Sequence, residues 1–414
     1  MNLAEKYNDK KIVVLAEETN KYAETLRRKG VKLLIGDLSD KNFLQRAKIK
    51  TASQVFAVID NDDKKNVEIA QNISQISKRN VLECFTLIND RKLKTVLEES
   101  ALFKYQTGNF DGILFNINEM GIKYGIATNI DKILPDKIET PPEILLVGLT
   151  EKTEIIFLNL AHCLTMKGKK FKFAVVEKDD SKVSEFKTKY AYLQNFADVD
   201  FVCEEIIKDR QFNCIFVCTE NQTEAIIKAV EIRYILGKNE PNIIVFANDK
   251  ETFEEVLKTE LEQKKVVVIN LFCQIADYVF DLEKHIEEQA KTAHYFWDKN
   301  KPYDEQSGHF KQTNRNQILD NYLRTYIALG EKMTVIKNRS ILFSDNEKET
   351  LAIMEHRRWM LEKYENGWIF GVRVKPDEFK RHDCLIEWEK LPDGETQKDF
   401  NAIDLMIQLL NSQK

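Results

Sequence analysis

Aromatic, acidic and basic side chains are interleaved in the C-terminal part of this 414-residue chain. Three of its four tryptophans, Trp359, Trp368 and Trp388, lie there among glutamate, histidine, arginine and lysine residues. Aromatic faces beside guanidinium and imidazole groups can bind a planar, negatively charged ligand such as a nucleotide. The same tryptophans could instead form the core of a small helical domain, an interpretation that residue types alone favour.

Residue patterns for catalysis or metal binding are weak elsewhere in the chain. Glu355-His356 lacks the second histidine of a zinc-binding HExxH helix, and the sequence has no Walker loop or Gly-x-Ser-x-Gly turn. His162-Cys163 lies in an apolar stretch predicted to be a helix, which favours a place in the core over a nucleophile pair. We therefore predict a chain that binds and reports, with no catalytic residues and no metal ligands.

The elements that must position such residues alternate between strand and helix over the first two thirds of the chain, which is typical of a doubly wound parallel sheet. In a first round, strands are predicted at 11–16, 32–36, 54–59 and 81–87, with helices at 19–29, 40–46 and 66–76. After a break at Pro141-Pro142, a second round has strands at 144–148, 171–177, 214–218, 242–246 and 266–269, with helices at 154–166, 183–190, 222–236 and from 252. The unbroken apolar strands indicate burial on both faces, and the two rounds indicate an internal duplication.

Composition and charge exclude several classes of protein. With 43% hydrophobic and 31% charged residues, the chain is typical of a soluble protein of two to four domains. Its net charge of −5 argues against a general nucleic-acid-binding surface. Seven cysteines without CxxC spacing, no membrane-length apolar run and no apolar signal region favour a cytoplasmic location.

Two acidic motifs in the first round resemble the N-terminal domain of Trk potassium-uptake regulators and regulator-of-K⁺-conductance modules. They are Gly36-Asp37-x-x-Asp40 and Ile59-Asp60-Asn61-Asp62-Asp63, with Asn66 downstream. The resemblance covers residues 2 to about 90. It implies a Rossmann-like nucleotide-binding unit in which Glu17 or Glu18 binds ribose hydroxyls, Asp37 lies on the adenine side, and Asp60 belongs to the site. The alternative for the acidic loop is a solvated turn.

One departure from that family concerns the first strand and its Gly-x-Gly-x-x-Gly turn, which carries the pyrophosphate in the family. Here residues 2–7 already resemble the helix that follows this turn. The missing strand would lie in the middle of the sheet, so its loss would leave unpaired backbone groups. Either the sequence is truncated at its start, or another segment or subunit fills the gap.

The second round keeps its first strand but only the first glycine of the turn, Gly148. Glu151 and Glu154 would repel a phosphate there, whereas Glu177 ends the next strand where a ribose-binding acid belongs. Thr219 follows a later strand at the edge of the expected crevice. We interpret this unit as a structural relic in preference to an NAD site.

The order of residues in the C-terminal part resembles the ryanodine-receptor (RyR) repeat domain over roughly residues 350 to 412. The matching residues are Glu355-His356-x-Arg358-Trp359, Gly367-Trp368-x-x-Gly371, His382, Leu385, Trp388, Leu391-Pro392 and Lys398-Asp399. The resemblance implies a mainly α-helical, ligand-binding module. In it, Arg358 and Lys398 would contact phosphate or ribose, the three tryptophans would wall the pocket, and Glu355, His382 and Asp399 would make hydrogen bonds.

Four domains are therefore expected. They are a TrkA-N-like Rossmann unit at 1–138 that lacks its first strand, a second, degenerate Rossmann unit at 139–280, a helical segment at 281–345 and the RyR repeat at 346–414. The helical segment is interpreted either as an ordinary helical hairpin or as a degenerate first copy of the RyR repeat.

The combined resemblances imply a bacterial, cytoplasmic sensor, in which the RyR module binds a nucleotide-derived ligand and the Rossmann units assemble a homodimer. An effector of antiviral nucleotide signalling is one hypothesis. A nucleotide-gated regulator of potassium transport is the alternative, and an NAD-consuming or NAD-dependent enzyme is the second alternative. NAD(H), ATP and an ADP-ribose-like or cyclic nucleotide are the candidate ligands. A membrane channel or transporter is a candidate partner, and the protein could join the membrane through that partner or through a missing N-terminal part.

Overall fold

The computed structural model describes residues 11–19, 23–76, 81–104, 108–134, 140–163, 170–237, 241–248, 261, 263–297, 299–306, 308–329, 340, 342–365, 367–372 and 380–411. Two compact units are present. The first comprises Met1–Gly121 and Phe272–Ile318, and the second comprises Ile122–Leu271 and Leu319–Lys414. The four predicted domain boundaries follow sequence order and remain a prediction.

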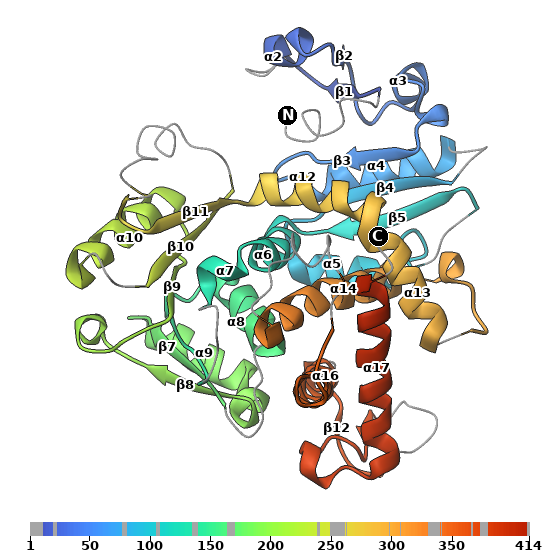
Figure 1. The fold of residues 1–414 in the computed structure, drawn as a ribbon. Coiled ribbons are helices and arrows are strands. Elements are labelled where there is room, and N and C mark those ends of the chain that lie inside the picture. Colours follow the sequence, from blue (N-terminus) through green and yellow to red (C-terminus); the bar gives the residue numbers. More distant parts are fainter. Residues whose placement is uncertain are drawn as a thin grey trace. The chain divides into compact units, whose positions relative to one another are not determined.

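The strands of the first unit form two separate parallel sheets (Figure 1). One sheet pairs β1 (Val13–Ala16) with β2 (Lys32–Ile35), and the other has the order β3 (Gln54–Ala57), β4 (Leu82–Leu87), β5 (Phe110–Phe115). Among the described residues, no strand joins β1 to β3. The predicted helix at 2–7 lies outside the described residues.

The helices of the first unit are α2 (Ala23–Arg28), α3 (Lys41–Arg46), the 3₁₀ turn η1 (Ile49–Thr51), α4 (Asp63–Ile76), α5 (Arg91–Glu98) and the start of α6 (Ile117–Thr128). A later part adds α12 (Leu271–Asp281), the π-helical η4 (Leu282–Ile286), α13 (Glu287–Trp297), η5 (Tyr303–Glu305) and the start of α14 (Gly308–Leu329). Helix in this part begins at Leu271, ahead of the helical segment predicted at 281–345. Asp40 and Asp90 cap α3 and α5 by accepting hydrogen bonds from backbone amides of the first turn.

The second unit contains one parallel sheet in the order β11-β10-β9-β6-β7-β8. The strands are β6 (Glu143–Val147), β7 (Phe171–Val176), β8 (Ala197–Phe201), β9 (Cys214–Val217), β10 (Asn242–Ala247) and β11 (Val266–Asn270). β6, β9 and β10 are almost fully buried, as their unbroken apolar sequences predict. β8 was not predicted, because the exposed Asp198 and Asp200 interrupt its apolar pattern at the edge of the sheet.

The first strand of this second sheet, β6, lies between β7 and β9. The corresponding place in the first unit is the interruption between β1 and β3. The fold is therefore mixed α/β with parallel sheets, as expected from the sequence, and the strands described in the first unit form two sheets.

The remaining helices of the second unit are α7 (Ile130–Ile133), α8 (Glu151–Cys163), α9 (Asp180–Lys189), η2 (Ala191–Asn195), η3 (Glu204–Lys208) and α10 (Gln222–Leu236). The predicted helix from 252 lies outside the described residues apart from Leu261. The C-terminal part is mainly helical, as expected, with α16 (Asp345–Glu365), β12 (Ile369–Phe370), β13 (Arg381–His382), η7 (Trp388–Lys390) and α17 (Asp393–Asn411). Within the described residues, no helix is both long enough and apolar enough for a membrane crossing.

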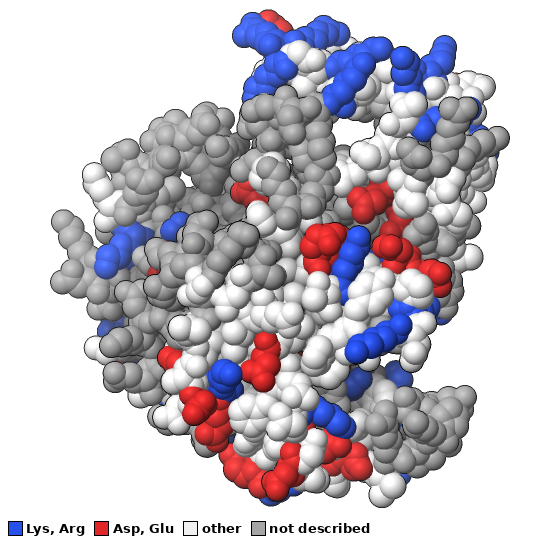
Figure 2. All heavy atoms as spheres, turned by 45° about the vertical axis from the view of Figure 1, so that its right-hand side comes forward, with Lys and Arg blue, Asp and Glu red and all other residues white. Residues whose placement is uncertain are grey.

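Charge is unevenly distributed despite the small net charge of −5. Lysine and arginine side chains gather over the part of the first unit that contains α2, β2 and α3 (Figure 2). The sequence there includes Arg27, Arg28, Lys29, Lys32, Arg46, Lys48 and Lys50. Such a patch raises the local concentration of anions near the surface.

Candidate functional site

Three acidic side chains lie just beyond the carboxyl ends of β1, β2 and β3 in the first unit. Glu17, Asp37 and Asp60 are all exposed there, as is Glu18. Ligands of open α/β sheets bind at the carboxyl ends of the strands. The three carboxylates therefore stand at the edge where ligands of such sheets bind, as the sequence predicted.

Lys65, on the first turns of α4, connects these strand ends. Its ammonium donates a hydrogen bond to the Glu17 carboxylate. That hydrogen bond, together with the negative charges of Glu17, Asp37 and Asp62, raises the pKa of Lys65. The predicted acids of β1 and β2 thus share one cation, which sequence reasoning missed. Its only sequence signal is the Lys64-Lys65 pair that follows the acidic turn.

The acidic turn itself has two kinds of carboxylate. Asp62 accepts a hydrogen bond from the Lys65 amide at 2.9 Å, and Asp63 accepts bonds from the Asn89 and Asp90 amides at 2.8 and 3.0 Å. Asp60, by contrast, is exposed next to Asn61, whose φ of 55° is left-handed. The solvated-turn interpretation therefore describes Asp60 better than Asp62 and Asp63, which stabilise the loop.

Asn66 links the chain after β3 to the end of β4. Its fully buried amide side chain accepts from the Ile59 amide at 2.7 Å and donates to the carbonyls of Ile59 and Leu87 at 2.8 and 3.1 Å. These contacts fix the end of β3 against the end of β4. A buried, fully paired amide gives the exposed acids a rigid support.

In the second unit, the predicted site residues Glu177 and Thr219 form hydrogen bonds with the protein's own backbone. Glu177 accepts hydrogen bonds from the amides of Leu149, Lys178 and Asp179 at 2.8, 2.7 and 3.0 Å. Burial opposes ionisation of Glu177, but these amides and the nearby Lys182 lower its pKa. Thr219 donates from its hydroxyl to the Asn221 carbonyl at 2.7 Å. Glu177 accepts from the backbone amide of Leu149, the residue after Gly148. These hydrogen bonds favour a structural role for Glu177 and Thr219.

Gly148 allows the sharp turn at the end of β6. Its φ of +89° is left-handed, and an added Cβ would lie 2.7 Å from the Cys218 carbonyl oxygen. We expect Gly148→Ala to lower the free energy of unfolding by about 1–3 kcal/mol, because it adds backbone strain and a clash with backbone. Urea denaturation measures the loss. Gly30→Ala is the matched control, since Gly30 has a similar φ of +76° but nothing within 4 Å, so it isolates the strain from the clash.

Two of the predicted ligand contacts in the C-terminal part lie in a buried ion-pair group. Arg324 donates to the Glu355 carboxylate, and Arg358 donates to both oxygens of Glu355 at 3.0 Å. The remaining Arg358 nitrogen donates to Glu362 at 2.8 Å. Each of the three guanidinium nitrogens of Arg358 thus donates to a carboxylate of the protein itself. Its role as a phosphate contact stays a prediction.

Trp359 and His356 on α16, Trp368 just before β12, His382 on β13 and Trp388 on η7 form an aromatic group. Trp359 lies edge-on to His382 at 4.8 Å between ring centroids, and Trp368 lies 6.3 Å from His382. His356 joins Trp359 to Trp388, at 5.8 and 6.0 Å. The structure therefore brings together all four predicted aromatic and imidazole side chains, each of them only partly buried.

Lys363 and Asp399 complete the surroundings of this group, whereas Lys398 does not. The Lys363 ammonium lies over the rings of Trp368 and Trp359, at 4.8 and 6.0 Å from their centroids. Asp399 lies 3.5 Å from His356 Nδ1, and burial raises its pKa against the effect of that contact. Lys398 is exposed and pairs with Glu395 at 2.7 Å. The sequence analysis did not select Lys363, because its position in the sequence alone does not show that its ammonium lies over two rings.

Comparisons with known proteins agree with part of these expectations. Residues 1–104 match the TrkA-N domain model, which confirms that resemblance. Solved structures with a similar fold include GsuK bound to ADP, with 14% identity and a TM-score of 0.42 over 68% of this chain and 65% of that chain. The GsuK RCK domain shows 11% identity and a TM-score of 0.41, over 68% and 73% of the two chains. The GsuK channel bound to NAD shows 10% identity and a TM-score of 0.40, over 68% and 61%.

The chain thus spans about 65% of the length of the GsuK chain that it matches first. Similarity at this identity and TM-score is too low to indicate a shared ligand or partner.

Proposed function

We propose that this protein is a regulatory protein whose TrkA-N domain binds an adenine nucleotide. The observation that carries the proposal is the position of Glu17, Asp37 and Asp60 at the carboxyl ends of β1, β2 and β3, inside the segment that matches the TrkA-N model. Exposed carboxylates at this edge suit ribose hydroxyls and the adenine amino group. Lys65 and the basic surface of the same unit would attract the phosphates.

The regulated process we propose is potassium transport, with a membrane channel or transporter as the partner. The TrkA-N match supports this hypothesis over an antiviral effector, for which the C-terminal part provides only an aromatic group. A homodimer assembled through the Rossmann units belongs to the same proposal. The hydrogen bonds of Glu177 to three backbone amides support a structural role for the second unit.

A second candidate site is the aromatic group of the C-terminal part, as the RyR resemblance suggests. Trp359, Trp368 and Lys363 combine ring faces with a cation, which suits a nucleotide-derived ligand such as ADP-ribose or a cyclic nucleotide. Arg358 and Glu355 would support this group from beneath, through the buried ion pairs.

Calorimetric titration of the full chain with ADP, ATP, NAD⁺ and NADH tests the first proposal. We expect at least one of them to bind and, at about a hundred times its dissociation constant, to stabilise the chain by roughly 2.7 kcal/mol. Glu17→Gln and Asp37→Asn should each weaken binding about tenfold, the loss of about one charge-assisted hydrogen bond. Glu185→Ala removes an exposed carboxylate of α9 in the second unit and is the control.

Each outcome has a definite meaning. Absence of binding at millimolar nucleotide would overturn the proposal, and so would binding that both variants leave unchanged. Binding that Trp359→Ala and Lys363→Ala abolish, while Glu17→Gln leaves it intact, would assign the ligand to the aromatic group instead.

A further inference from the structure

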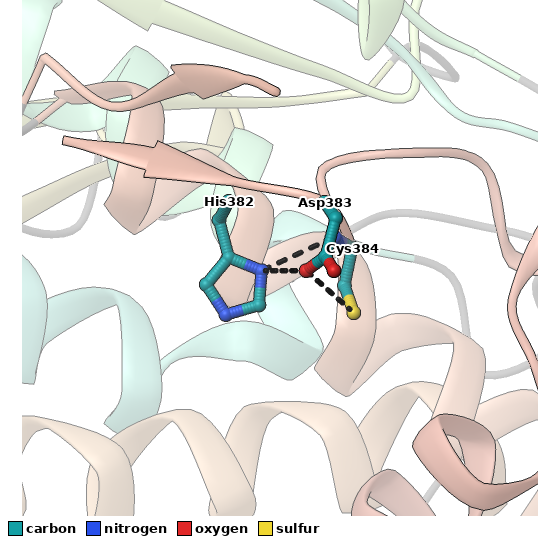
Figure 3. A group of neighbouring side chains, drawn as sticks. All are labelled: His382, Asp383 and Cys384. Carbon is teal, nitrogen blue, oxygen red and sulfur yellow. Dashed lines mark hydrogen bonds and ion pairs between the residues drawn. The ribbon is translucent and has the colours of Figure 1, made fainter. Parts of the chain in front are cut away.

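The loop after β13 brings three metal-ligating side chains together, at the edge of the aromatic group. His382, Asp383 and Cys384 each offer one ligand atom, and these atoms all lie within 4.8 Å of one another. Figure 3 shows the imidazole Nδ1, the carboxylate and the thiol on the same side of the loop. Successive side chains of an extended segment point to opposite sides, so it is the turn after β13 that brings these three together.

The distances match the edges of a small tetrahedron. His382 Nδ1 lies 3.4 Å from Asp383 Oδ1, and Cys384 Sγ lies 3.7 Å from the same oxygen. Zinc bonds of about 2.0–2.3 Å at tetrahedral angles place neighbouring ligand atoms about 3.3–3.8 Å apart. Two of the three separations therefore equal those between neighbouring corners of one coordination sphere, and the third is at most 4.8 Å.

The three side chains offer one nitrogen, one oxygen and one sulfur donor, from the end of β13 and the loop that follows it. A solvent molecule completes the fourth position of a tetrahedral ion in such a three-ligand site.

We propose that His382, Asp383 and Cys384 bind a thiophilic divalent cation of the zinc class. Thiol and imidazole donors select such an ion over Mg²⁺ or Ca²⁺, which prefer oxygen ligands. Binding forms an S–metal bond and releases the thiol proton to solvent. The metal takes the Nδ1 lone pair that now accepts a 3.1 Å hydrogen bond from the Cys384 amide. The ion would fix the turn that follows β13, beside the aromatic group.

A Co²⁺ titration of the metal-free full chain tests this site, because Co²⁺ reports its ligands by colour. We expect tetrahedral visible bands and a near-ultraviolet thiolate-to-metal band, both displaced by Zn²⁺. Cys384→Ser should abolish the thiolate band and weaken Zn²⁺ binding by more than about tenfold. Cys203→Ser removes an exposed thiol elsewhere and should leave both signals intact.

Asp383→Asn is the second variant, since this exposed side chain can change without disturbing a core. It should keep the thiolate band but weaken Zn²⁺ binding, and it decides the question if Cys384→Ser does not fold. A Co²⁺ spectrum without a thiolate band, or one that both variants leave unchanged, would overturn the proposal. Nucleotide titrations are read separately, so loss of this site and loss of nucleotide binding are distinguishable.

Discussion

Replacing Glu355 by alanine is expected to lower the free energy of unfolding by about 3–5 kcal/mol, the usual cost of removing one partner of a buried ion pair. Glu355 is 5% exposed and accepts from both Arg324 and Arg358, and Arg324 is 1% exposed. Without the carboxylate, a fully buried guanidinium on α14 loses its counter-charge. Urea denaturation measures the change. Glu389→Ala, at an exposed acid of the same C-terminal part, is the control and should change stability by less than about 0.5 kcal/mol.

The same ion pairs make stability depend on pH. Burial opposes ionisation of Glu355, but Arg324 and Arg358 lower its pKa to about 2 from an ordinary value of 4.5. A carboxyl whose folded pKa is depressed contributes its full stability above the unfolded pKa. That contribution is lost as pH falls from about 4.5 to about 2 and amounts to about 3 kcal/mol. Acid titrations of Glu355→Gln should show a shallower loss over this window. Identical acid limbs for both proteins would contradict the assignment.

Replacing Lys311 by methionine is expected to lower the free energy of unfolding of the first unit by about 3–5 kcal/mol. The Lys311 ammonium lies 2.6 Å from Asp111 Oδ2, and the two side chains are only 4% and 7% exposed. Lys311 stands on α14 and Asp111 on β5, so the pair holds the helix to the sheet. The substitution leaves a buried carboxylate without this cation, whereas methionine keeps most of the apolar volume.

A double-mutant cycle separates the pair from other effects of the substitution. Adding Asp111→Asn to Lys311→Met removes the uncompensated charge, so the double variant should recover at least about 1 kcal/mol relative to additivity. Lys291→Met on α13 is the control, because its 3.6 Å contact with Glu288 is a surface pair worth about 0–1 kcal/mol. Strict additivity of the two substitutions would show that Lys311 and Asp111 do not stabilise each other.

Local sequence patterns were sufficient for many elements of this protein. Apolar runs identified β6, β9 and β10 because each strand is buried along nearly its whole length. The two acidic motifs led to the TrkA-N resemblance, and Gly148 marked a turn that only glycine accommodates without strain. Each of these features depends on residues that are neighbours in the chain.

Local sequence patterns did not reveal which partners the charged residues bind. Lys65 meets Glu17 across 48 positions, Arg324 meets Glu355 across 31, and Lys311 meets Asp111 across 200. A charged side chain looks the same in the sequence whether it faces solvent, a ligand or an opposite charge in the core. Arg358 therefore suggested a phosphate contact, although packing surrounds it with Glu355 and Glu362. Burial determines which of these interactions forms, because only the folded chain removes the competing water.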